Sequence, residues 1–169
     1  METKVPFYHV VNILLPGLVF IGACLFLFID EIQVLFRAVL SPDDSIGFEV
    51  LVTVSCLAIA YEAGYIIFRL GAVLLDSALR KLFGGRDYLL FVAAKKAGAT
   101  SLDMLSREYA YARTHIVLFI LLAIVMGVSK HWLLFLVCIS CITLFTLTAR
   151  GHTKKIAVTI DKYLTEECK

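Results

Sequence analysis

The chain has 169 residues, of which 60% are hydrophobic and 18% are charged, and its formal net charge at pH 7 is +2. A soluble domain normally carries about 45–50% apolar and about 25% charged residues, so this composition excludes an ordinary soluble domain and indicates an integral membrane protein. The small net charge gives no sign of nucleic-acid binding, and we expect no direct contact with nucleic acid.

Four apolar segments predict the membrane spans. They cover about 7–29, 48–68, 114–128 and 132–147, and a helix needs about 20 apolar residues to cross a hydrocarbon layer about 30 Å thick. The last two segments are short and are separated by "GVSKHW". Because this leaves room only for a tight turn, they are predicted to form a helical hairpin. We therefore expect an all-α membrane protein with four spans in a single domain, 1–169.

Basic residues predict the orientation of these spans. Most of them lie between the second and third spans and in the tail, namely Arg80, Lys81, Arg86, Lys95, Lys96, Arg107, Arg113, Arg150, Lys154, Lys155, Lys162 and Lys169. The first connection contains only Arg37, together with several acidic residues. By the positive-inside rule, both termini and the parts 69–113 and 150–169 are expected in the cytoplasm. We expect a multi-pass protein of the inner (plasma) membrane, in contact with the anionic inner leaflet.

The connections between the spans contain helix signals of their own. In "EIQVLFRAVL" at 31–40, apolar residues recur with the spacing of a helix that lies on a membrane interface. In the central connection, "DYLLFVAAKKAG" predicts a short helix closed by Gly98. A capping box from Thr100 to Asp103 then opens a helix that is expected to continue into the third span. In the tail, Ile156, Ile160, Tyr163 and Leu164 are predicted to share one helix face.

The second span has a charged face. If 48–83 is a single helix, it is about 54 Å long, so its last turns are predicted to project into the cytoplasm. Glu62, Arg69 and Asp76 lie seven residues apart on one face, with Tyr65 between the first two. One interpretation is a structural ion pair or a protonated, buried glutamate. The other is a polar seam that faces a cavity or pore formed by several copies.

The opposite face of the second span carries small residues. Ala60, Gly64, Gly71 and Ala78 follow one another at intervals of four or seven residues. Helices in a bilayer associate through close backbone approach, and small residues permit it. We expect this face to pack against another helix, either in the same chain or in another copy of the chain.

Arginine and tyrosine residues crowd the end of the central connection. Together with two lysines they form a predicted docking surface of Lys95, Lys96, Arg107, Tyr109, Tyr111 and Arg113. This composition is suited to a protein partner or an anionic ligand. The alternative is an anchor for lipid headgroups.

The sequence gives no indication of enzymatic chemistry. Its four histidines, His9, His115, His131 and His152, are all near predicted interfaces, each at a different span end, and do not converge with carboxylates. No nucleophile–base pair or metal-ligand spacing accompanies them. We expect no enzyme, no metal and no cofactor.

Three stretches carry a resemblance to a known group of proteins. They are "YEAGYIIFRLGAVLLD", "DYLLFVAAKKAG" and "LSREYAYARTH". The chain resembles small bacterial four-span membrane proteins of anti-phage defence operons, such as the membrane subunit of Kiwa-type systems or the membrane effectors of nucleotide-signalling systems. The resemblance implies homo-oligomers and a cytoplasmic protein partner, and it transfers no functional residue.

These features lead to two functional hypotheses. The first is a non-enzymatic membrane protein, self-associating, that couples a membrane event to a cytoplasmic partner in anti-phage defence. The second is an ion-conducting pore or small transporter that uses the Glu62/Arg69 polar line.

Overall fold

The computed structural model describes residues 7–27 and 46–166, and all regular secondary structure within these ranges is helical. The elements are α1 (Phe7–Leu27), α3 (Ile46–Leu70), the π-helical segment η1 (Gly71–Leu75), α4 (Asp76–Phe83), α5 (Tyr88–Lys96), α6 (Ser101–Val128) and α7 (Trp132–Glu166). Helices α1, α3 with its continuation, α6 and α7 are long and apolar enough to cross a membrane. The predicted all-α class is confirmed for the described residues. The amphipathic helix predicted at 31–40 lies outside them.

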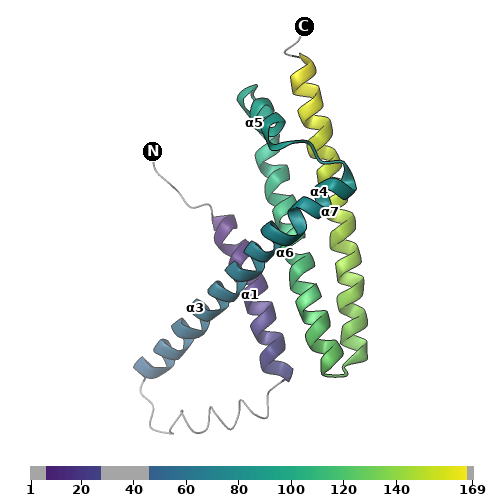
Figure 1. Cartoon of the computed structure of the whole chain (residues 1–169). Coiled ribbons are helices and arrows are strands. Elements are labelled where there is room, and N and C mark those ends of the chain that lie inside the picture. The colour runs from purple at the N-terminus through teal and green to yellow at the C-terminus, as the bar shows by residue number, and fades with distance from the viewer. Residues whose placement is uncertain (1–6, 28–45, 167–169) are drawn as a thin grey trace.

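Helices α6 and α7 form the predicted hairpin (Figure 1). The turn between them is closed by hydrogen bonds from the His131 and Lys130 amides to the Met126 and Gly127 carbonyls, at 3.0 and 3.2 Å. Lys130 takes the left-handed conformation that ends many helices, with φ 59°. Helix α7 does not stop near residue 147 but continues to Glu166, so the tail belongs to the same helix. At 35 residues it is about 52 Å long.

Helix α6 is the central helix of the fold. In its most apolar window 56% of the residues are buried, against 22% or less in the other three candidate spans. Three buried clusters follow one another along it, and each contains residues of α6 together with residues of its neighbours. Large apolar side chains of α3 and α7 remain exposed, as expected where helices face lipid.

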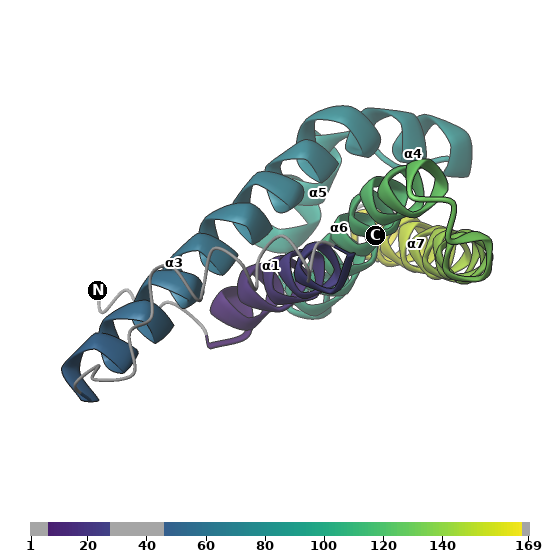
Figure 2. The same cartoon turned by 90° about the horizontal axis from the view of Figure 1, so that it is seen from below.

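Helices α1 and α3 cross through small residues. Ala60 and Gly64 of α3 are buried, and Gly17 of α1 lies directly against their backbone. A methyl group at either glycine would overlap the main chain of the facing helix. The small face of the second span therefore packs within the same chain. Helix α1 also contacts α6, and it lies between α3 and the hairpin (Figure 2).

The second span continues without interruption through η1 into α4. Leu70 and Asp76, which flank η1, both have α-helical backbone angles. Figure 1 shows that α4 passes across α6 and α7 and does not point away from them. Its Leu79 packs in one cluster with Ala149, which lies about 26 Å along α7 from Trp132 at 1.5 Å per residue. The extension of the second helix thus exists, but it lies against the hairpin at roughly one hydrocarbon thickness from the turn.

Helix α5 packs against the far end of the hairpin. It ends at Lys96, and Gly98, with φ 94°, closes the turn that follows, as the sequence predicts. Its Ala94 is buried with Leu102 of α6 and Ile160 of α7, and the predicted stripe of the tail packs around them. The capping box is not formed: Thr100 makes no capping side-chain bond, and the Asp103 carboxylate instead accepts a 2.7 Å bond from Lys95. We call residues 84–108 and 150–166 the head.

Candidate functional site

The candidate site is an ion cluster centred on Asp76. Arg113 Nη1 donates a 2.7 Å hydrogen bond to Asp76 Oδ1, and Arg80 Nε lies 3.0 Å from Asp76 Oδ2. The Arg113 side chain is only 10% exposed and that of Asp76 24%, so the pair between α4 and α6 is largely removed from solvent. A partly buried, hydrogen-bonded ion pair of this kind fixes two helices relative to each other.

The π-helical segment explains why the two helices meet at this point. Gly71 is buried against Arg113, and a Cβ at this position would lie 3.5 Å from Arg113 Cγ and from its carbonyl oxygen. These are ordinary van der Waals distances, so the segment lies in contact with α6 at this point. A π-helical turn shifts the register of the residues that follow it, and Asp76 is the first residue of α4 after that turn. The Arg113 guanidinium also lies 5.8 Å from the ring centres of Phe68 and Tyr109.

The cluster carries more positive than negative charge. Two guanidinium groups, those of Arg80 and Arg113, share the single carboxylate of Asp76. Nearby, Asp161 binds Arg86 at 2.6 Å, Glu108 lies 3.2 Å from His152, and the Asp87 side chain is exposed. At the Asp76 carboxylate itself, the two guanidinium groups leave a surplus of one positive charge.

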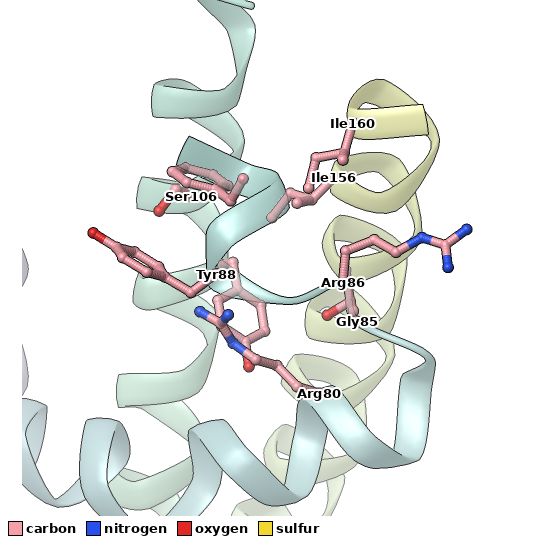
Figure 3. A pocket seen from close by; sticks show the side chains of 10 residues that line it. Arg80, Gly85, Arg86, Tyr88, Ser106, Ile156 and Ile160 are labelled. Atoms are coloured by element: carbon pink, nitrogen blue, oxygen red, sulfur yellow. The ribbon is translucent and has the colours of Figure 1, made fainter. Parts of the chain in front are cut away.

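A cavity of about 90 Å³ adjoins this cluster, between α4, α5, α6 and α7. Its lining residues are Arg80, Gly85, Arg86, Tyr88, Phe91, Ser106, Tyr109, Thr153, Ile156 and Ile160. Figure 3 shows the side chain of Arg80 reaching from α4 toward α6, whereas the Arg86 side chain points away from the cavity. Tyr109 is 5% exposed, and its hydroxyl lies beside the Asp76 carboxylate without a hydrogen bond of ordinary geometry to any described residue.

The predicted polar seam is divided in two by the structure. Glu62 is exposed on the surface of α3 and makes no ion pair with a described residue. Arg69 Nε and Nη2 bond to the Tyr65 hydroxyl at 2.8 and 2.7 Å, so Arg69 does not reach back to Glu62. Asp76 belongs to the ion cluster. The interpretation of Glu62 as a buried glutamate or as a partner of Arg69 was wrong, because its side chain faces outward from the four helices.

The predicted docking surface is also divided. Tyr109 and Arg113 are buried, at 5% and 8% exposure, so they cannot belong to an exposed surface. Tyr111 is half-buried and its ring lies against that of His115, tilted by 39° with ring centres 3.9 Å apart. The remaining three residues, Lys95, Lys96 and Arg107, are exposed on the head.

Of the small residues predicted to pack on the second span, Ala60, Gly64 and Gly71 are buried, whereas Ala78 is exposed.

Sequence reasoning missed the partner of Asp76. Arg113 is 37 positions away, and the sequence predicts it to belong to an exposed docking surface. Arg80 enters the prediction only as one of the basic residues that indicate orientation. The available signal was the position of Arg113 next to an apolar run, because an arginine in such a place requires a counter-charge.

The residues of this site are suited to bind a charged group. Among the residues of 7–27 and 46–166, no group of three His, Cys, Asp or Glu side chains is placed to hold a metal ion. Comparisons of the chain with protein-family models, with curated proteins and with solved structures found no match. The ion cluster, the cavity and the exposed surfaces are the features of the molecule that bear on its function.

Proposed function

We propose that this protein is a non-enzymatic, multi-pass membrane component that works as a homo-oligomer and couples an event in the membrane to a cytoplasmic protein partner. The resemblance to membrane proteins of anti-phage defence operons supports defence as the setting. In this proposal the head lies in the cytoplasm, in agreement with the basic residues of the central connection and the tail.

The ion pair between Asp76 and Arg113 is the observation that carries this proposal. Helix α3 has no break before α4, and α4 is bonded to α6 through this pair. Helix α6 in turn extends to Ser101 in the head, where it packs with α5 and α7. A change in the tilt of α3 would therefore be transmitted to the head through this ion pair and the packing of Leu79 around it.

The head offers a surface for a partner. Outside the predicted spans, Tyr88, Leu89, Met104 and Val158 are between 65% and 80% exposed. Lys96 and Arg107 are exposed on the same part of the protein. Exposed aromatic and aliphatic side chains with neighbouring basic groups are typical of protein interaction surfaces. The expected partner is a soluble protein with an apolar patch bordered by acidic residues.

Replacing Leu89 with aspartate is expected to abolish the partner interaction. Leu89 is 80% exposed, so the substitution leaves the packing of the fold intact while it places a charge in the apolar surface. Loss of a central interface residue lowers affinity by about tenfold or more. The measurement is recovery of the product of a neighbouring gene with the tagged membrane protein, combined with the efficiency of phage plating on cells that express both.

Thr165→Asp is the matched control, because it adds the same charge at an exposed position at the end of α7. It is expected to retain recovery and protection. Equal recovery with Leu89→Asp and Thr165→Asp, or no recovery of any soluble partner with the unmodified protein, would contradict the proposal.

A pore remains the second candidate, and the exposure of Glu62 favours it. A single charge in the hydrocarbon layer costs about 2.5–3.5 kcal/mol on insertion scales, so an outward-facing glutamate is more stable when another copy covers it. The polar line Glu62, Tyr65 and Arg69 would then lie between copies.

If this line conducts ions, Glu62→Gln is expected to change ion flux or membrane potential at unchanged protein abundance. Asp161→Asn removes one charge from the head and serves as the control, with no expected effect on flux. Unchanged flux in Glu62→Gln excludes the pore.

A further inference from the structure

We propose that the cavity between α4, α6 and α7 is a binding site for a phosphate group, supplied by a phospholipid headgroup. This proposal is independent of the cytoplasmic partner. It is based on the charge of the ion cluster, on the donors that remain free around the cavity, and on the position of the cavity along α7.

The charge of the cluster calls for an anion. Arginine remains protonated under all physiological conditions, so Arg80 and Arg113 contribute two positive charges against one from Asp76. Arg113 is 8% exposed, and its Nε has no hydrogen-bond partner among the described residues. Of the two arginines, Arg80 lines the cavity and its side chain is 41% exposed, so an anion that enters the cavity can reach its charge.

Donors suited to phosphate surround the cavity. Arg80 uses Nε for Asp76, which leaves its two terminal nitrogens for a ligand, and its side chain extends toward α6 at the cavity (Figure 3). Paired N–H groups of arginine match the oxygens of a phosphate. The Tyr109 hydroxyl is buried, lines the cavity and lacks an ordinary hydrogen bond within the described chain. Ser106 adds a second hydroxyl to the wall.

The position of the cavity indicates where the phosphate comes from. Thr153 on the cavity wall lies about 32 Å along α7 from Trp132 at 1.5 Å per residue. The hydrocarbon layer is about 30 Å thick, so a hairpin that starts at one interface brings this cavity to the headgroup level of the other. On the same continuous helix, Val73, Leu74 and Leu82 are 63–74% exposed and can contact acyl chains. The cavity, of about 90 Å³, has room for a phosphate group.

The test uses the full-length protein in detergent with three probes: dioctanoyl phosphatidylglycerol, dioctanoylglycerol without phosphate, and inorganic phosphate. Binding is measured by calorimetry and by the shift in Tm. Arg80→Gln is expected to weaken binding of the phospholipid by about tenfold or more, because one charged donor group is lost. Tyr109→Phe removes only the hydroxyl and keeps the aromatic packing. It is also expected to weaken binding of the phospholipid.

Lys81→Gln is the matched control, since it removes the same charge from the neighbouring, exposed position of α4. The affinity of this variant for the phospholipid is expected to stay within about twofold of that of the unmodified protein. Dioctanoylglycerol is expected to give no saturable binding. If inorganic phosphate binds with the same dependence on Arg80, the phosphate site is supported and is filled from solution.

The proposal is overturned if Arg80→Gln and Lys81→Gln bind the phospholipid equally, or if removal of the phosphate from the lipid makes no difference. It is also overturned if neither phosphate-containing probe binds to the unmodified protein. Circular dichroism of each variant establishes that the helices are retained, and Tyr109→Phe tests the site even if Arg80→Gln proves unstable.

Discussion

Replacement of Asp76 by asparagine is expected to lower the free energy of unfolding by about 3–5 kcal/mol, because it leaves two arginines without their carboxylate. Arg113 is the main cause of this effect, since its side chain is 10% exposed and its hydrogen bond to Asp76 is the charged contact between α4 and α6. The amide of asparagine retains the shape of the side chain but cannot neutralise either guanidinium. Unfolding by denaturing detergent in mixed micelles, followed by circular dichroism, measures the loss.

Asp161→Asn is the control for this prediction. The same substitution there removes the carboxylate from a pair of similar length, 2.6 Å to Arg86, but both side chains are about half exposed. An exposed ion pair contributes only about 0–1 kcal/mol. Equal losses in the free energy of unfolding for Asp76→Asn and Asp161→Asn would mean that the pair between Asp76 and Arg113 does not stabilise the fold.

Substitution of Gly64 by alanine is expected to separate α1 from α3 and to destabilise the protein by about 3 kcal/mol. The new methyl group would overlap the carbonyl oxygen of Ile13, a backbone atom that cannot move without the whole of α1. Gly17→Ala meets the Ala60 carbonyl in the same way and is expected to have a similar effect. The same unfolding measurement detects both losses.

Gly22→Ala provides the comparison in the same helix as Gly17. No heavy atom lies within 4 Å of a Cβ built at Gly22, so the substitution costs nothing in packing. Because glycine is a poorer helix former than alanine, Gly22→Ala is expected to stabilise by about 0.5–1 kcal/mol. If Gly64→Ala were as stable as Gly22→Ala, the close crossing of α1 and α3 would be contradicted.

The sequence predicts much of the helical architecture. Hydrophobic length identifies the four long helices, the short "GVSKHW" connection identifies the hairpin, and Gly98 identifies the end of α5. These features depend on neighbouring residues, so they can be read from local patterns. Three of the four small residues that are predicted to pack, Ala60, Gly64 and Gly71, are buried, and Ala78 is exposed. The pattern does not reveal that α1 is the partner of Ala60 and Gly64.

Long-range contacts could not be predicted in the same way. The pair between Asp76 and Arg113 joins residues 37 positions apart, and its formation depends on the register shift in η1. Helical periodicity placed Asp76 on the face of Glu62, but a π-helical turn between them changes which neighbour Asp76 meets. The burial of Tyr109 likewise follows from α4 lying across α6, a direction that no local pattern specifies.

The central claim is that the second span and α4 form one rod that is fixed to α6 by Asp76 and Arg113. A double-mutant cycle with Asp76→Asn, Arg113→Gln and the double variant tests this claim most directly, with the free energy of unfolding in mixed micelles as the readout. A coupling energy of about 2 kcal/mol between the two sites is expected for a direct, partly buried pair. Additive effects, within about 0.5 kcal/mol, would contradict it.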